Sequence, residues 1–177
     1  AYRGDTIAEL LHFAGGCERV FAFEPDEKTH KKLCLAVEQM GLAGRATCVQ
    51  MAAYSHQQTL EFDSRGGRQS ALREESLVTG AAGAAKPKIK LVQGQSLDNV
   101  AGEETVTLIN MDVEGAERQA LEGCAKIIAR DRPKMLLAAY HRSEDLFAIP
   151  LQIAAMRPDY RFYLRHYPYI PAWDTNL

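Results

Sequence analysis

The sequence predicts an α/β protein built on an open, doubly wound sheet whose strands run mostly parallel. Short apolar runs typical of buried strands alternate with longer segments in which apolar residues recur at i, i+3, i+4 and i+7, as in sheet-covering helices. The 177 residues suffice for one domain with a sizeable core. Hydrophobic residues make up 46% and charged residues 25% of the chain, which are globular values and exclude a disordered, collagen-like or coiled-coil protein.

The first half of the chain alternates between helix and strand patterns. Asp5 or Thr6 can cap the first helix, and Gly15 follows its last apolar residue, because glycine adopts the left-handed conformation that ends a helix. Pro25 suits the first turn of a second helix, where it lacks only an N–H that has no helical partner. The elements expected here are a helix over 6–14, a strand over 19–24, a helix over 25–40 and a strand over 46–50.

The middle of the chain has a different pattern. Residues 59–63 and 89–93 alternate between apolar and polar side chains, which is typical of edge or antiparallel strands. Between them, residues 64–87 are rich in Gly, Ala, Ser and Arg. We expect a flexible surface loop over the functional site there, with a short helical piece around 72–77.

Regular alternation then resumes. We expect a strand over 106–112, a helix over 116–128, a strand over 135–139, a helix that opens at Pro150 and runs through 156, and a late strand over 161–166. A doubly wound sheet also needs a central strand before its first helix. We therefore expect upstream residues to supply it, so that residues 1–177 are a single domain lacking its first strand.

The functional site is expected where the strands end, because ligands of such sheets bind at the carboxyl ends of the strands. Glu24 closes a strand 20 residues after Gly4, a spacing at which an acid often accepts both ribose hydroxyls of a nucleoside. The alternative role of Glu24 is to complement the dipole of the helix that follows. Met51 and Ala52 follow the next strand, where small residues leave room for an adenine ring.

Two later strand ends carry groups suited to proton transfer. Asp112 and Glu114 close one strand; Asp112 should point into the cleft, and Glu114 either joins it or caps the next helix. His141 follows the strand after that, at a place where a pKa near neutrality would suit a general base. Beside it, Arg142 either holds an anionic substrate or is solvated. Tyr163 and three aromatic residues of the tail either stack on a sugar or pack the late strands; those three are Tyr167, Tyr169 and Trp173.

Charge and cysteine usage limit the partners. The net charge of −2 and the pI near 6.2 argue against nucleic acid, and no apolar stretch is long enough to span a membrane. The four cysteines form no C-x-x-C pair, so we expect reduced thiols and a reducing compartment such as the cytoplasm. No histidine spacing matches a metal motif, so the sequence assigns no metal ligand; the paired acids leave a catalytic metal open as an alternative. The spacing of the strand-end residues favours a nucleoside-containing cofactor, but it does not separate S-adenosylmethionine from NAD.

Several runs resemble one family. FAFEPDEKTHKKL, LINMDVEGAERQALEGC, YHRSEDLFAIP and the tail LRHY followed by DTNL are similar to the FkbM-type S-adenosylmethionine-dependent methyltransferases. The opening AYRGDT resembles the back half of the family's glycine-rich first motif. The Ser-rich stretch of the family's middle loop is reduced here to residues 66–70, which end in Ser70.

The resemblance implies a Rossmann-like class I methyltransferase fold with an antiparallel last strand. It places cofactor-binding residues as follows: Gly4, Asp5 and Thr6 by the methionine part, Glu24 with Pro25 on the ribose, Met51 and Ala52 near adenine, and Asp112 beneath the reacting end. The implied reaction is O-methylation of a sugar or natural product by an in-line displacement. His141 is our first candidate for the general base, with Asp112 or Glu114 in reserve. An NAD(P)-dependent oxidoreductase and a non-catalytic cofactor-binding module stay open as alternatives.

Overall fold

The computed structural model describes residues 1–63, 71–72, 88–166 and 175–176, and it confirms the α/β class. Its helices are α1 (Asp5–Ala14), α2 (Glu27–Gln39), α3 (Leu97–Ala101), α4 (Glu117–Glu122), α5 (Ala125–Asp131) and α6 (Asp145–Met156). Its strands are β1 (Val20–Phe23), β2 (Ala46–Val49), β3 (Ala52–Ala53), β4 (Gln58–Asp63), β5 (Ala71–Leu72), β6 (Ile89–Gln95), β7 (Leu108–Met111), β8 (Lys134–Leu137), β9 (Arg165–His166) and β10 (Thr175–Asn176).

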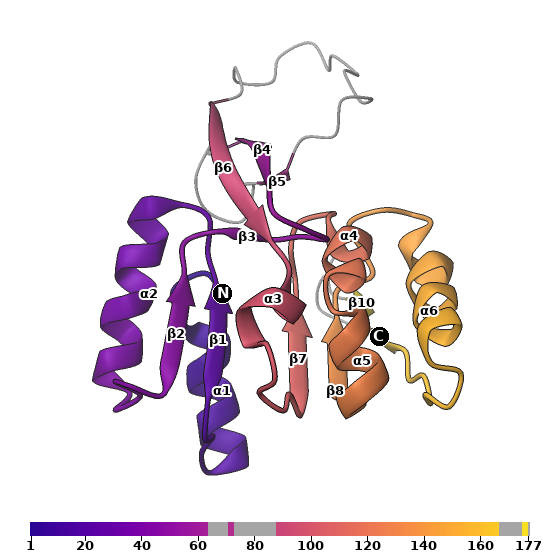
Figure 1. Cartoon of the computed structure of the whole chain (residues 1–177), viewed down its shortest axis with the longest axis horizontal. Helices are drawn as coiled ribbons and strands as arrows, with labels where there is room; N and C mark the ends of the chain where they lie inside the picture. Colours follow the sequence, from indigo (N-terminus) through magenta and orange to yellow (C-terminus); the bar gives the residue numbers. More distant parts are fainter. Residues whose placement is uncertain (64–70, 73–87, 167–174, 177) are drawn as a thin grey trace.

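Four strands lie side by side in the order β2, β1, β7, β8, and all point the same way (Figure 1). β1 pairs with β2 in parallel, and β7 pairs with β8 in parallel; these two pairs form separate hydrogen-bonded sheets among the described residues. Helices α3 and α5 lie in front of β7 and β8, whereas α1 lies behind β1 (Figure 1). The parallel arrangement brings the carboxyl ends of β1, β7 and β8 to one edge.

A further, mainly antiparallel sheet has the strand order β3-β6-β4-β5. β4 runs antiparallel to β6 from Gln58 opposite Gly94 to Asp63 opposite Ile89, as the alternating patterns predicted. The short strand β3 follows β2 in the chain and pairs with β6 in parallel. β9 and β10 form a further antiparallel pair near the carboxyl terminus.

Two apolar clusters hold the helices to the strands. One joins α1 and α2 to β1 and β2 through five buried residues: Ile7, Ala22, Leu33, Val37 and Leu42. The larger cluster joins α3, α4, α5 and α6 to β7 and β8, and its fully buried members include Leu121, Ile128 and Ile149. Each cluster thus packs its helices against the strands that it joins.

The ends of the first two helices differ from the sequence prediction. Neither Asp5 nor Thr6 caps α1: the N-cap is Gly4, with φ of 86° and no side-chain cap. α2 starts at Glu27, and Asp26 caps it by accepting the Thr29 N–H at 3.0 Å. Pro25 therefore lies before the cap rather than in the first turn.

The predicted helix over 116–128 is two helices, broken at Gly123 and Cys124. At the break, Asp98 replaces a helical hydrogen bond: its N–H donates to the Gly123 carbonyl at 2.9 Å, and its carboxylate accepts the Ile127 N–H, which a continuous helix would give to that carbonyl. The backbone of Tyr54 lies so near that a Cβ on Gly123 would be 2.0 Å from its carbonyl oxygen, so the position requires glycine. The apolar periodicity continues across this interruption and does not reveal it.

Three further expectations need correction or fall outside the described ranges. α6 begins at Asp145, five residues before Pro150, which lies inside the helix. The late strand is limited to Arg165–His166, and residues 161–164 are irregular. Leu72 belongs to β5 rather than to a helical piece. Residues 64–70 and 73–87, together with Tyr167, Tyr169 and Trp173, lie outside the described residues.

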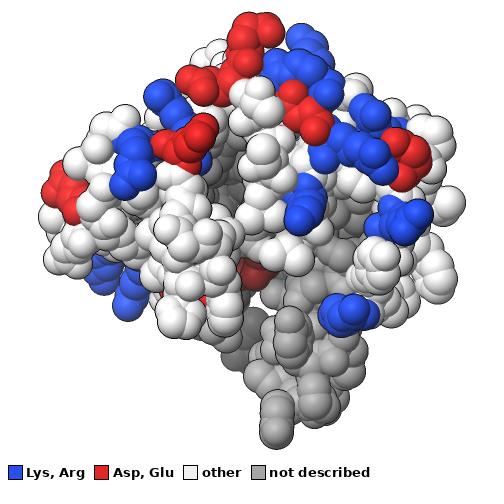
Figure 2. Space-filling view, turned by 90° about the horizontal axis from the view of Figure 1, so that it is seen from below, with Lys and Arg blue, Asp and Glu red and all other residues white. Residues whose placement is uncertain are grey.

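The surface at the amino ends of the strands carries both signs of charge. Figure 2 shows Lys and Arg interspersed with Asp and Glu over the described part of this face. That part therefore offers no single-sign surface of the kind that nucleic acid selects. The helices in the described ranges are too short or too polar to cross a bilayer.

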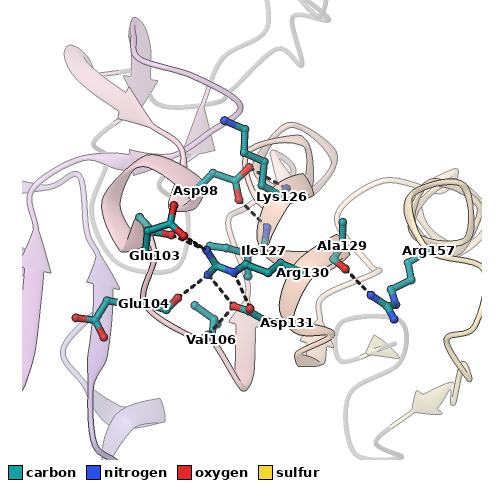
Figure 3. A network of polar contacts seen from close by, with 11 residues as sticks. Asp98, Glu103, Glu104, Val106, Lys126, Ile127, Ala129, Arg130, Asp131 and Arg157 are labelled. Atoms are coloured by element: carbon teal, nitrogen blue, oxygen red, sulfur yellow. Dashed lines mark hydrogen bonds and ion pairs between the residues drawn. The ribbon is translucent and has the colours of Figure 1, made fainter.

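A polar network joins α3 to α5 (Figure 3). Asp98 accepts the N–H groups of Lys126 and Ile127, both at 3.0 Å, and so caps α5, whose own N-cap residue supplies no side-chain hydrogen bond. Arg130 donates to two carbonyl oxygens of the segment after α3 and to Asp131, which accepts the Val106 N–H at 2.8 Å. Figure 3 also shows Arg157 donating to the carbonyl of Ala129.

Replacing Asp98 with Ala should lower the free energy of unfolding by about 1–2 kcal/mol, because two N–H groups at the start of α5 lose their acceptor. Urea unfolding followed by circular dichroism measures this change. Glu103→Ala is the matched control from the same network: its side chain is fully exposed and lies 3.6 Å from Arg130, so its loss should cost under about 0.5 kcal/mol. Equal effects of the two substitutions would contradict the capping role.

Candidate functional site

The carboxylate of Glu24 is buried where β1 ends. Glu24 is 8% exposed, and its Oε1 accepts the Asp26 N–H at 3.0 Å. Its Oε2 lies 3.9 Å from the Ala1 nitrogen, which donates to the Phe23 carbonyl at 2.7 Å. Burial raises the pKa of Glu24, while the Ala1 amine and the Asp26 N–H act in the opposite direction. The carboxylate thus faces the opening segment of the chain, beside the start of α1.

The predicted glycine turn is present next to Glu24. The Gly4 N–H donates to the Ala1 carbonyl at 3.1 Å, which turns the chain into α1. A Cβ on Gly4 would meet Ala36 and Met40 of α2 at 3.4 Å, so its missing side chain serves close packing against α2. Asp5 and Thr6 are exposed at the first turn of α1.

The other predicted cofactor residues lie after the neighbouring strand. Met51 is half-buried in the bend after β2, and Ala52 is buried in β3, opposite Gly94 of β6. Pro25 follows Glu24 directly and is half-buried. The ends of β1 and β2 are adjacent, so these residues lie along the same edge of the sheet as Glu24.

The ends of β7 and β8 bring together the three residues that the sequence assigned to catalysis. His141 Nε2 lies 3.4 Å from Asp112 Oδ1 and 3.3 Å from Glu114 Oε2. The side chain of Asp112 is 52% exposed and that of Glu114 is 33% exposed, whereas that of His141 is 13% exposed. The Tyr140 hydroxyl donates to Asp112 Oδ2 at 3.1 Å and fixes that carboxylate.

Glu117 is a site residue that the sequence analysis missed. Its side chain is fully buried, its Oε1 lies 2.8 Å from His141 Nδ1, and the same oxygen accepts the Val113 N–H at 3.0 Å. Burial opposes its ionisation, but His141 and the Val113 N–H hold the pKa of Glu117 below its usual value. An acid in the first turn of a helix is typical of dipole complementation. Only the fold shows that this one turns inward.

Glu114 occupies a strained turn. Its φ is 56° and that of Gly115 is 97°, so both central residues of the turn from Val113 to Ala116 have positive φ, as in a type I′ turn. A left-handed conformation costs a residue with a Cβ roughly 1–2 kcal/mol. This turn carries the Glu114 carboxylate back towards His141 rather than letting it cap α4. Of the two roles that the sequence left open for Glu114, the structure therefore favours the one in the site.

The surroundings of His141 change its predicted protonation. Burial by itself lowers the pKa of the imidazole, but the contacts with Glu114 and Glu117 and the charge of Asp112 raise it to about 10. The expected pKa near neutrality is therefore wrong, since the three carboxylates stabilise the imidazolium. Burial raises the pKa of Asp112, and the charges of Glu114 and Glu117 raise it further. The charge of His141 and the hydrogen bond from Tyr140 lower it in part.

Another buried acid lies near this group. Asp145 is 1% exposed at the start of α6, and neither of its carboxylate oxygens has a hydrogen-bond partner among the described residues. Burial and the charge of Glu117 raise its pKa, and Arg142 acts against them. Arg142 thus stands beside a buried carboxylate and is not simply solvated.

The Glu24 end and the His141 end lie at the same edge, because β1, β7 and β8 all point the same way (Figure 1). Of the predicted strand-end groups, the structure brings the side chains of Asp112, Glu114 and His141 together.

Comparison with known proteins defines the class. Residues 1–171 match the sequence profile of the methyltransferase FkbM domain, and the chain belongs to this family. A search of curated proteins finds no match to the chain.

A solved structure supports the same assignment. The crystal structure of an FkbM methyltransferase from Methylobacillus flagellatus KT is similar, with a TM-score of 0.77 and 27% sequence identity. The similarity covers 99% of this chain but 40% of that protein, so this chain spans less than half the length of its structural neighbour.

The imidazolium of His141 should persist well above neutral pH. We expect the ring signals of His141, assigned by comparison with His141→Gln and recorded in EDTA, to titrate with a pKa near 10 by NMR. Because the folded-state value lies above that of the unfolded chain, this group stabilises the fold fully below about pH 6.5. That contribution is lost as the pH rises through 10. Titration of the His141 ring near pH 6.5 would contradict the predicted charge cluster.

Proposed function

We propose that the protein transfers the methyl group of S-adenosylmethionine to a hydroxyl of a sugar or natural-product small molecule. The observation that carries the proposal is the buried Glu24 carboxylate beside the Gly4 turn. Oε1 is fixed by the Asp26 N–H, and the acid stands between the first helix and the end of β1, where the two hydroxyls of a ribose would find a charged acceptor. Family membership supports methyl transfer as the reaction class.

The residues present fit this cofactor. Glu24 would hold the ribose with Pro25 beside it, Met51 and Ala52 would lie near the adenine, and Gly4 to Thr6 would lie near the methionine part. Bound there, S-adenosylmethionine supplies a methyl group already activated by its sulfonium. Fixing two reactants in line can lower the barrier by roughly 7–11 kcal/mol, so positioning is the protein's main task.

The second task is to remove the proton of the acceptor hydroxyl. Asp112, Glu114 and His141 stand at the ends of β7 and β8 and form the proposed catalytic group. With His141 protonated at neutral pH, the carboxylate of Asp112 is the base better suited to this step. It is the most exposed of the three, and its raised pKa strengthens its affinity for a proton. His141 then acts by holding the two carboxylates in place.

Calorimetry tests the cofactor site directly. S-adenosylmethionine and S-adenosylhomocysteine should bind the wild-type chain, and Glu24→Gln should weaken both at least about tenfold, because charged hydrogen bonds contribute roughly 1.5–3 kcal/mol each. Glu18→Gln is the matched control, since it removes the same charge from an exposed site at the other end of β1.

Three outcomes would count against the proposal. Unchanged affinity in Glu24→Gln would remove that acid from the ribose site. Tighter binding of NAD than of S-adenosylmethionine would favour an oxidoreductase. Cofactor binding without methyl transfer to any acceptor in a broad hydroxyl panel would favour a binding module.

The catalytic group should affect turnover more than cofactor affinity. With the best acceptor of such a panel, we expect Asp112→Asn to lower kcat by about 10²–10⁴, and His141→Gln to lower it as well. Release of S-adenosylhomocysteine is the readout. The control is Glu122→Gln, an exposed acid of α4, which should keep full turnover. Unchanged kcat in Asp112→Asn would move the base elsewhere.

A further inference from the structure

The donor atoms of Asp112, Glu114 and His141 have the spacing of a metal-binding site. One atom from each of these side chains lies within 4.8 Å of the other two. His141 Nε2 is 3.4 Å from Asp112 Oδ1 and 3.3 Å from Glu114 Oε2. Two ligand atoms bound at about 2.0–2.2 Å to one ion stand about 2.8–3.6 Å apart at octahedral or tetrahedral angles. Both histidine–carboxylate separations fall in this range, and the two carboxylate oxygens lie within 4.8 Å of each other.

The imidazole is already oriented as a ligand. Metal-binding histidines typically donate their second ring N–H to a carboxylate, which fixes the ring and leaves the other nitrogen for the ion. Glu117 is placed for this role, with Oε1 2.8 Å from His141 Nδ1 and its side chain fully buried. Its Oε2 has no hydrogen-bond partner among the described residues, so the buried carboxylate is held only on one oxygen.

The carboxylates of the cluster outnumber its cations. Those of Asp112, Glu114 and Glu117 lie around the His141 imidazole, and Arg142 is the further cation nearby, with its Nε 3.5 Å from where a Cβ on Gly115 would be. Excess negative charge in a partly buried site is costly unless a cation offsets it. An ion of charge +2 on His141 Nε2 replaces one proton and adds a net positive charge where the carboxylates converge.

We propose that Asp112, Glu114 and His141 bind a divalent transition-metal ion. The mixed set of one nitrogen and two carboxylate oxygens favours Mn²⁺, Co²⁺ or Zn²⁺ over Mg²⁺, which prefers oxygen ligands alone. The three ligands come from two segments, after β7 and after β8, so no spacing in the sequence indicates the site. The inference concerns the same three residues as the proposed catalytic group, but its test measures ion binding and needs neither the cofactor nor a methyl acceptor.

Mn²⁺ binding to the untagged full chain, followed by electron paramagnetic resonance, tests the proposal. The signal of free Mn²⁺ should fall with one ion bound per chain, and Co²⁺ should give the visible absorption of a protein-bound ion. Asp112→Asn and His141→Gln should each weaken Mn²⁺ binding at least tenfold. Glu117→Gln should weaken it by about 10–100-fold without removing a ligand. Mg²⁺ should compete only weakly.

The controls separate a specific site from general attraction. His56→Gln and Glu122→Gln remove an exposed imidazole and an exposed carboxylate elsewhere and should keep wild-type affinity. Asp112 is half-exposed, so its variant should fold as the wild type does, which circular dichroism in EDTA checks. The proposal is overturned if the wild type does not bind Mn²⁺ at millimolar concentration, or if a folded Asp112→Asn binds it as tightly. Neither result would change the calorimetry of S-adenosylmethionine.

Discussion

The contact between Glu117 and His141 is the constraint on which the arrangement of the site depends. The fully buried carboxylate of Glu117, at the start of α4, accepts the Val113 N–H after β7 and contacts the His141 imidazole after β8. It thus joins the segment after β7 to the segment after β8. A buried charge without its partner is strongly destabilising, so each side of this contact requires the other. On the other side of the ring, Nε2 lies near Asp112 and Glu114. The contacts with Glu114 and Glu117 and the charge of Asp112 together raise the pKa of His141 against the effect of burial.

The parallel strands determine how the site is divided. β1 ends at the buried acid proposed for the nucleoside, whereas β7 and β8 end at the group proposed for the acceptor. A cofactor lying across this edge would have its sugar at one end and its reactive group at the other.

Family membership and the geometry support each other at different levels. The FkbM match over residues 1–171 establishes the family, and the similar solved structure supports the class of fold. The charge cluster around His141 is what this structure adds, and it is the basis of both proposals: Asp112 as the proton acceptor, and an ion held by Asp112, Glu114 and His141. The structural neighbour is more than twice as long as this chain, so the methyl acceptor and the activity of the whole protein are proposals that the experiments above test.

Local patterns in the sequence determined the order of strands and helices, because the buried face of each element requires apolar residues at a regular spacing. The same patterns placed Glu24, Asp112 and His141 at strand ends. Tertiary contacts decided the rest. The break at Gly123 coincides with hydrogen bonds to Asp98 and with the backbone of Tyr54, 69 residues earlier, which leaves no room for a side chain. α6 starts at Asp145, ahead of Pro150, and buries Asp145, Ile149 and Ile153. The inward position of Glu117 and the pKa of His141 depend on distances between segments that are remote in sequence. Such distances leave no periodic trace, and only the folded chain contains them.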